Sequence, residues 1–204
     1  GVLTLGSLTL NSGATTKFRL TDPSPVDGFV ANDRVDVLGD LTLGGTLDAT
    51  ISAAGTYRLF NYGGSLSGAF GTVVTSSGRP GFDIDSAVID TSLSGQVNLG
   101  VLSSGQSMQF WDGNNTVPST IAQGAGGSGT WNNANTNWTN SSGSSNGTWG
   151  SSVGVFAGAA GEVLIAGEQK FDTLQFLTDG YVLNADPGNG SLAIEAATGT
   201  GTLN

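Results

Sequence analysis

The sequence predicts an all-β fold, a right-handed parallel β-helix with protruding loops, from three features of its 204 residues. Short apolar phrases of period two recur every few tens of residues, which is the pattern of a stacked β repeat. Glycine supplies 34 residues and separates the phrases, but it follows no strict triplet, so a collagen helix is excluded. The intervals between phrases are irregular, which suits a β-helix with loops of varied length better than an antiparallel sandwich or barrel.

The organising phrase is Val35–Ile51, VDVLGDLTLGGTLDATI, in which an L-T-L motif lies between glycines. The same motif occurs at Gly6–Leu10, GSLTL, and looser relatives occur at Gly64–Gly68, Thr91–Gly95 and Gly190–Ile194. Strands of this kind stack best when glycine, asparagine and aspartate form the corners between them. We therefore expect each phrase to be one strand of a repeating rung.

Each strand prediction follows from the alternation of apolar and polar residues. In Thr15–Leu20 this alternation turns Phe18 and Leu20 inward and Lys17 and Arg19 outward. In chain order the other strands are expected at Val2–Leu5, Leu8–Leu10, Arg34–Leu38, Leu41–Ile51, Thr56–Asn61, Gly68–Thr75, Phe82–Ile84, Ala87–Ile89, Val97–Val101, Val153–Phe156, Glu162–Ala166, Phe171–Leu177, Tyr181–Asn184 and Leu192–Glu195.

Composition divides the chain into three segments. Residues 1–105 are predicted as β-helix rungs, residues 106–161 as irregular rungs or a linker rich in Gly, Ser, Asn and Trp, and residues 162–204 as further rungs of a truncated coil. All four tryptophans lie in the middle segment, where Asp112 is the single charged residue. A flexible linker has no use for large aromatic residues, so we expect this segment to be partly ordered.

Charge and composition exclude several classes of function. The net charge is −10, from 16 acidic and 6 basic residues, so the chain lacks the cationic surface that nucleic acids require. The same charge disfavours docking on anionic membranes. The chain has no cysteine, which excludes disulfide and thiol chemistry, and no histidine, which removes the commonest general base and metal ligand. No apolar run approaches the ~20 residues of a membrane-spanning helix.

Two sets of motifs carry a resemblance to a known family. The runs GSLTLNSGATTKFRL, NDRVDVLGDLTLGGTLDATI and GTYRLFNYGGSLSGAF resemble the β-helical passenger region of bacterial autotransporters. The later runs FWDGNN, GSGTWNNANTNW, VFAGAAGEVLIAG and DTLQFLTDGYVLNADPGNGSLAI resemble the autotransporter-associated β-strand repeat. The resemblance implies export across the outer membrane through a C-terminal β-barrel of the same full-length polypeptide, expected outside these residues. It also implies display at the bacterial cell surface or secretion.

The function expected from the sequence is that of a non-catalytic stalk and adhesion module. Its partners would be a host-cell or bacterial surface protein or glycan, and copies of itself. Aromatic rings are natural platforms for sugars and proteins, so the candidate contact residues are Trp131, Trp138, Trp149 and, in the proline-containing loop 21–32, Phe29. The alternative is that the tryptophans pack inside the fold.

Two other functions stay open at this point. A carbohydrate-active enzyme would use paired carboxylates, for which Asp83 with Asp85 and Asp33 with Asp36 are the candidates. Because no cluster of Lys, Arg or His accompanies them, we predict no catalytic residue. The other function is that of a segment that mainly assists folding of the passenger during secretion.

No cofactor or metal is expected either, since the calcium-binding nonapeptide and the EF-hand loop are both absent from the sequence. Asparagine-x-serine/threonine triplets, which match glycan acceptors, begin at Asn114, Asn137, Asn140 and Asn146. In a segment made largely of Asn, Ser, Thr and Gly, such triplets arise from composition alone.

Overall fold

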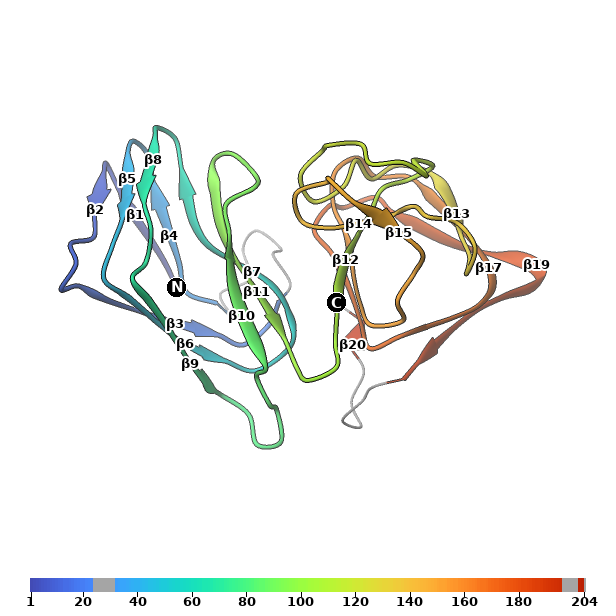
Figure 1. Ribbon diagram of the computed structural model, residues 1–204, viewed down its shortest axis with the longest axis horizontal. Helices are drawn as coiled ribbons and strands as arrows, with labels where there is room; N and C mark the ends of the chain where they lie inside the picture. Colours follow the sequence, from blue (N-terminus) through green and yellow to red (C-terminus); the bar gives the residue numbers. More distant parts are fainter. Residues whose placement is uncertain (24–31, 196–201, 204) are drawn as a thin grey trace. The chain divides into compact units, whose positions relative to one another are not determined.

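The computed structural model describes residues 1–23, 32–195 and 202–203, and the chain divides into two compact units (Figure 1). Unit 1 is Gly1–Ser104 and unit 2 is Gly105–Asn204. The described residues contain strands and no α-helix, so the prediction of an all-β chain is confirmed. They accordingly include no helix suited to crossing a membrane. The segments 106–161 and 162–204 both lie in unit 2.

The described residues of unit 1 form eleven strands. They are β1 (Val2–Leu5), β2 (Leu8–Thr9), β3 (Thr15–Leu20), β4 (Arg34–Val37), β5 (Leu41–Leu43), β6 (Thr46–Ile51), β7 (Gly55–Tyr62), β8 (Leu66–Gly68), β9 (Thr72–Ser77), β10 (Ser86–Asp90) and β11 (Gln96–Leu102).

Strands β1 to β9 follow one repeating order through three sheets (Figure 1). Three consecutive strands enter three different sheets, and each later set of three pairs in parallel with the set before it, giving β1-β4-β7, β2-β5-β8 and β3-β6-β9. Residues at the same place in successive sets are therefore hydrogen-bonded neighbours, and like side chains stack on one another. Leu8, Leu41 and Leu66 form one such column.

Apolar side chains on one face of these strands form the core of unit 1. Phe18 and Leu20 are buried, as the alternation in the sequence predicts, and Leu41, Leu47 and Ile51 of the next strands are fully buried. The ring of Phe18 meets the edge of Phe60 from β7 at a centroid distance of 5.3 Å. In β6, at the end of the phrase Val35–Ile51, the apolar residues thus face the core and the residues between them face outward, as the alternation predicts.

A glycine corner separates β5 from β6, where the sequence predicted one continuous strand. Gly45 has a φ of 68°, a left-handed conformation that residues with a Cβ rarely adopt. At Gly44 a Cβ would lie 2.2 Å from the carbonyl oxygen of Leu10 in the preceding turn of chain. The corners of successive sets therefore pack backbone against backbone, which only glycine permits.

The end of unit 1 departs from the parallel order. β11 pairs antiparallel with β7 and with β10, and the register between β7 and β11 skips Leu59 at a bulge. The predicted strand Phe82–Ile84 is wrong, because these residues lie in an irregular segment before β10. Phe82 is buried there while Asp83 is exposed, so the apolar side chain anchors a loop and not a strand.

In the part of unit 2 that the structure describes there are nine strands. They are β12 (Met108–Trp111), β13 (Gly129–Trp131), β14 (Trp138–Thr139), β15 (Asn146–Gly147), β16 (Val153–Phe156), β17 (Glu162–Phe171), β18 (Thr173–Phe176), β19 (Val182–Ile194) and β20 (Thr202–Leu203).

Two sheets of unit 2 join the sequence segments 106–161 and 162–204. One has the order β15-β14-β12-β16-β18-β20 and the other the order β13-β17-β19. The pairs β12-β16, β16-β18, β13-β17 and β17-β19 are parallel, while the short strands β14 and β15 form an antiparallel hairpin beside β12. The tryptophan-rich segment thus contributes strands to both sheets.

The stacked core of unit 1 generates a first prediction. Replacement of Leu47 by alanine removes a fully buried side chain from the middle of three stacked strands and leaves a cavity. We expect a loss of about 2–5 kcal/mol in the free energy of unfolding, measured by urea denaturation followed by circular dichroism. The control is Leu38→Ala, because Leu38 is 71% exposed and its truncation should change the stability little. Equal effects of the two changes would contradict this assignment of the core.

Candidate functional site

The four tryptophans gather in one aromatic cluster inside unit 2. Trp138 lies at its centre, with ring centroids 5.3 Å from Trp111, 5.1 Å from Trp131 and 4.3 Å from Trp149. Phe156 of β16 packs 5.4 Å from the same ring. Most of these pairs meet edge to face, the arrangement that the charge distribution of aromatic rings favours. The cluster is therefore a packed core.

The glycines of this segment make room for the rings. Gly154 lies under the cluster, where a Cβ would stand 2.9 Å from Cη2 of Trp149 and 3.1 Å from Cη2 of Trp138. Two indole nitrogens also bind the backbone around the core. Trp111 donates to the carbonyl of Gly127 at 2.8 Å, and Trp149 donates to the carbonyl of Lys170 at 2.7 Å. The tryptophans thus connect loops to strands from within.

The three tryptophans predicted as partner contacts are buried. Trp131 and Trp138 have no exposed surface and Trp149 is 7% exposed, so their rings offer no platform to a partner in this conformation. This placement favours the alternative in which the tryptophans pack inside the fold. Phe29 lies outside the described residues. A partner contact by any of these four residues stays a prediction.

Asp112 has a structural role in this region that the sequence analysis did not predict. Its carboxylate is fully buried and accepts hydrogen bonds from the Ser119 hydroxyl at 2.8 Å, the Ala125 amide at 2.7 Å and the Asn146 side-chain amide at 3.1 Å. A buried carboxylate requires such donors, since desolvating an unpaired charge is costly. The signal in the sequence was that Asp112 is the single charged residue among its neighbours.

Asp112 and Asn146 together hold a surface loop, residues 114–121. The Asn146 amide also donates to the carbonyls of Asn115 at 3.0 Å and Val117 at 3.1 Å, so the loop is tied to the β14–β15 hairpin. Thr120 has a φ of 60°, which strains a β-branched residue. The loop exposes two apolar side chains, Val117 at 69% and Ile121 at 50%. It is one of the apolar projections that the structure describes in unit 2, besides those of Val182, Leu192 and Ile194 on β19.

Of the two carboxylate pairs considered for catalysis, one is hydrogen-bonded within the fold and the other is exposed to solvent. Asp33 accepts a hydrogen bond from the backbone amide of Arg19, and Asp36 accepts from the side chains of Arg34 and Asn61. Asp83 and Asp85 are both exposed, and the described residues place no basic side chain in hydrogen-bond contact with either.

The asparagines of the glycan-acceptor triplets differ in their accessibility. Asn137 is buried, and its amide donates to the carbonyls of Gly113 and Thr130, so a glycan has no access to it in the folded chain. The amide of Asn140 donates to Ser144, and Asn114 is exposed. Within residues 1–23, 32–195 and 202–203, no three acidic, histidine or cysteine residues lie close enough together to hold a metal ion.

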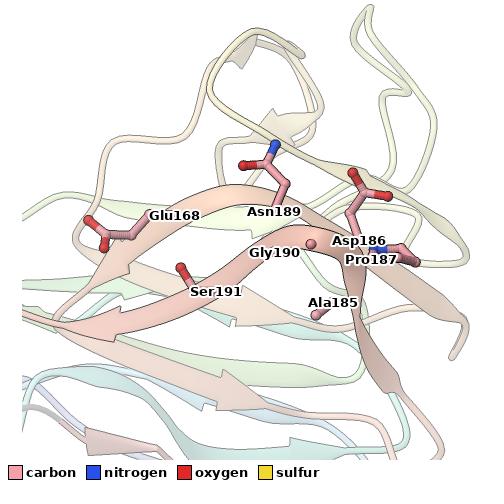
Figure 2. Close-up of a pocket in the computed structure, with 8 residues that line it drawn as sticks. Glu168, Ala185, Asp186, Pro187, Asn189, Gly190 and Ser191 are labelled. Carbon is pink, nitrogen blue, oxygen red and sulfur yellow. The ribbon is translucent and has the colours of Figure 1, made fainter.

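An open hollow of about 450 Å³ lies along β19 (Figure 2). Its lining includes Glu168 of β17 and the stretch from Ala185 to Ser191. In Figure 2 the side chains of Asp186 and Asn189 project from the same side of the ribbon. No aromatic ring and no basic side chain line the hollow, so it lacks the groups that hold a sugar or an anion.

Two groups of unit 2 titrate away from their ordinary range. Tyr181 packs against the aromatic cluster and donates its hydroxyl to the carbonyl of Ala157 at 2.6 Å, and burial raises the pKa of this hydroxyl to about 12. The carboxylate of Glu195, 2.6 Å from the ammonium of Lys170, raises the pKa of Lys170. The hydroxyl of Tyr181 is thus held by a backbone carbonyl, and the ammonium of Lys170 is paired with an exposed carboxylate.

The similarity of the chain to known proteins agrees with the resemblance seen in the motifs. The chain is 36% identical over 176 residues to the adhesin BmaC autotransporter of Brucella suis biovar 1 (strain 1330). The match covers 79% of this chain and 5% of the relative, so the chain spans about one twentieth of that protein's length. No protein-family profile matches the chain, and no solved structure matches it. The predicted resemblance to autotransporters is confirmed by this similarity.

The tight packing of the tryptophan cluster gives a second prediction. In Gly154→Ala the new methyl group has no room between Trp149, Leu174 and Trp138. We expect a loss of about 1–3 kcal/mol in the free energy of unfolding, measured by urea denaturation with tryptophan fluorescence. All four tryptophans lie in unit 2, so this signal reports on that unit. The control is Gly147→Ala, because a Cβ at Gly147 meets nothing within 4 Å. Similar losses for both variants would contradict the packing.

A third prediction concerns alkaline pH. The pKa of Tyr181 is about 12 in the folded chain and about 10 in an unfolded chain, so folding favours the protonated hydroxyl. Its contribution to stability is therefore complete below pH ~10 and is lost as the pH rises toward ~12. We expect the urea midpoint from tryptophan fluorescence to fall across this range, and to fall less steeply in Tyr181→Phe.

The matched control for this titration is Tyr57→Phe. Tyr57 is a buried tyrosine of unit 1 whose pKa burial also raises, so its replacement should leave the slope reported by the tryptophans of unit 2 unchanged. An unchanged slope in Tyr181→Phe would remove Tyr181 as the titrating group.

Proposed function

We propose the following function for this chain, whose sequence belongs to the autotransporters. The chain would be a non-catalytic segment of an autotransporter passenger that acts as a β-helical stalk and as an adhesion module. The observation that carries the proposal is the 36% identity, across most of the chain, to a protein named an adhesin. Its place would be the bacterial cell surface, after export across the outer membrane.

The pairing in unit 1 supports the stalk. Three sets of three strands stack in parallel, with apolar columns inside and Thr, Ser, Lys and Asp outside. Outside, Thr42 and Thr50 of the middle set bond to Ser67 and Ser76 of the next set, at 2.9 and 3.2 Å between side-chain oxygens. A stack of this kind lengthens by adding further sets, and it holds protruding loops on a stiff support. We propose that both units are parts of a right-handed parallel β-helix of this kind.

The loop 114–121 is our proposed contact surface. It is fixed from below by Asp112 and Asn146, and it presents Val117 and Ile121 to solvent. Exposed apolar side chains on a rigid loop bind partners at a low entropic cost, because the loop is already ordered before binding. The buried tryptophans would support this surface from the core.

The partner would be a protein or glycan on a host-cell or bacterial surface. Self-association stays a prediction, and the structure of β19 argues against pairing at that sheet edge. β19 is the outermost described strand of its sheet, and it carries a bulge and Pro187. Both features interrupt the ladder of hydrogen bonds that a second strand would need.

A binding experiment tests the proposal. The labelled chain is titrated onto host-cell and bacterial surfaces beside the double variant Val117→Ser/Ile121→Ser. We expect saturable binding, weakened about tenfold in the double variant, as the loss of roughly 1.4 kcal/mol of contact energy implies.

The control for this experiment is Val88→Ser, because Val88 is 63% exposed and lies in unit 1. Its binding should equal that of the unchanged chain. Saturable binding that the loop variant leaves intact would rule out residues 114–121 as the contact. Absence of binding to both surfaces would remove the adhesive role and leave a spacer, or a segment that assists folding during secretion.

A further inference from the structure

Two asparagine–glycine pairs of unit 2 stand in opposite environments. Asn146–Gly147 forms strand β15, and Asn189–Gly190 lies within β19. In any such pair the backbone nitrogen of the glycine can attack the side-chain amide carbon of the asparagine. The reaction is easiest before glycine, because no Cβ shields the nitrogen and the backbone turns freely. The two pairs therefore share a reactive sequence and differ in their surroundings.

The Asn189–Gly190 pair lies where an unpaired stretch of β19 ends and Gly190 rejoins the ladder opposite Gly167. Between its paired residues Ala185 and Gly190, β19 advances by five residues, whereas β17 advances only from Ile165 to Gly167. The extra residues bulge out of the ladder, and Gly188 takes a φ of 82° within them. Asn189 is exposed and lines the open hollow, with its side chain projecting into solvent (Figure 2).

No hydrogen bond from another described residue restrains the side-chain amide of Asn189, so its carbon is free to turn toward the nitrogen of Gly190. In contrast, the amide nitrogen of Asn146 donates to the Asp112 carboxylate and to the carbonyls of Asn115 and Val117, at 3.0–3.1 Å. Asn146 is also half-buried in the β14–β15 hairpin. For Asn146, an attack by the following nitrogen requires breaking all three hydrogen bonds.

We infer that Asn189 is a site of spontaneous deamidation in the folded protein. The nitrogen of Gly190 forms a bond to the side-chain carbon of Asn189, loses its proton, and ammonia leaves to give a cyclic succinimide. Water then opens the ring at one of its two carbonyl carbons and yields aspartate or isoaspartate. Water is the only co-reactant, and no enzyme or metal is needed.

The fold tolerates both products at this position. Isoaspartate inserts one extra carbon into the backbone, and the bulge between Ala185 and Gly190 already lies outside the paired register. The new carboxylate would join Asp186 and Glu168 along the hollow, which makes this surface more acidic. The modification thus changes the charge of the surface without moving the sheet, and it is independent of the adhesive role proposed above.

Peptide mass spectrometry of the intact chain tests the inference. The folded protein is incubated in neutral to mildly alkaline buffer and then digested with chymotrypsin. We expect the peptide with Asn189 to gain the mass difference between an amide and an acid, and to split into two products of equal mass. The amide of Asn189 should be lost several-fold faster than that of Asn146, and the two rates should converge in denaturant.

The variant Asn189→Gln provides the control, because glutamine would have to form a larger ring and reacts more slowly. It should lack the acidic form that appears on isoelectric focusing of the unchanged chain. Gly190→Ala is unsuitable, since its Cβ would lie 2.3 Å from the carbonyl oxygen of Ile165. Retention of the Asn189 amide in the folded chain, or equal rates at Asn189 and Asn146, would overturn the inference.

Discussion

Parallel pairing in register is the constraint on which both units depend. A parallel ladder places each residue beside its equivalent in the next strand, so a side chain that points inward forces the same position inward along the whole stack. In unit 1 the constraint is visible at Thr16, Leu47 and Val73, which are successive partners, and at Phe18, Ala49 and Thr75. The alternation within each strand then decides what is core and what is surface.

The same pairing requires a backbone that turns sharply between sheets. In unit 1 the turns are made by glycines such as Gly44 and Gly45, whose backbones touch those of the turn before them. In unit 2 some glycines also leave space for aromatic rings. Gly154 leaves space for Trp149 and Trp138, and Gly129 lies where a Cβ would meet the Trp111 ring at 2.9 Å. At these positions glycine permits close approach, which explains how four indole rings fit in so small a unit.

The sequence predicted much of this fold because its signals are local. Period-two alternation located β1, β3, β4 and β16 to within about a residue. The prediction failed where tertiary contacts decide. Phe82 and Ile84 alternate with aspartates as strand residues do, but no strand of the described residues pairs with them. Gly44 and Gly45 split a predicted strand because the carbonyl of Leu10 occupies the space beside them.

The candidate site was harder to predict than the fold, for a physical reason. A tryptophan has the same sequence signature in a core and on a surface, and only the packing of Phe156, Trp138 and Gly154 around Trp131 and Trp149 distinguishes the two. Likewise nothing next to Asp112 in the sequence shows that Asn146, far along the chain, will cap its carboxylate.

The buried cluster also limits where a partner can bind. Since the rings hold the strands and the carboxylate of Asp112 holds the loop, the surface of unit 2 is free to vary without loss of the core. A chain displayed outside the cell gains from this separation, because loop residues such as Val117 and Ile121 can be exchanged for others at little cost to folding. In the proposed adhesive role, the tryptophans would contribute through the rigidity of the loop that they support, and the loop would contact the partner.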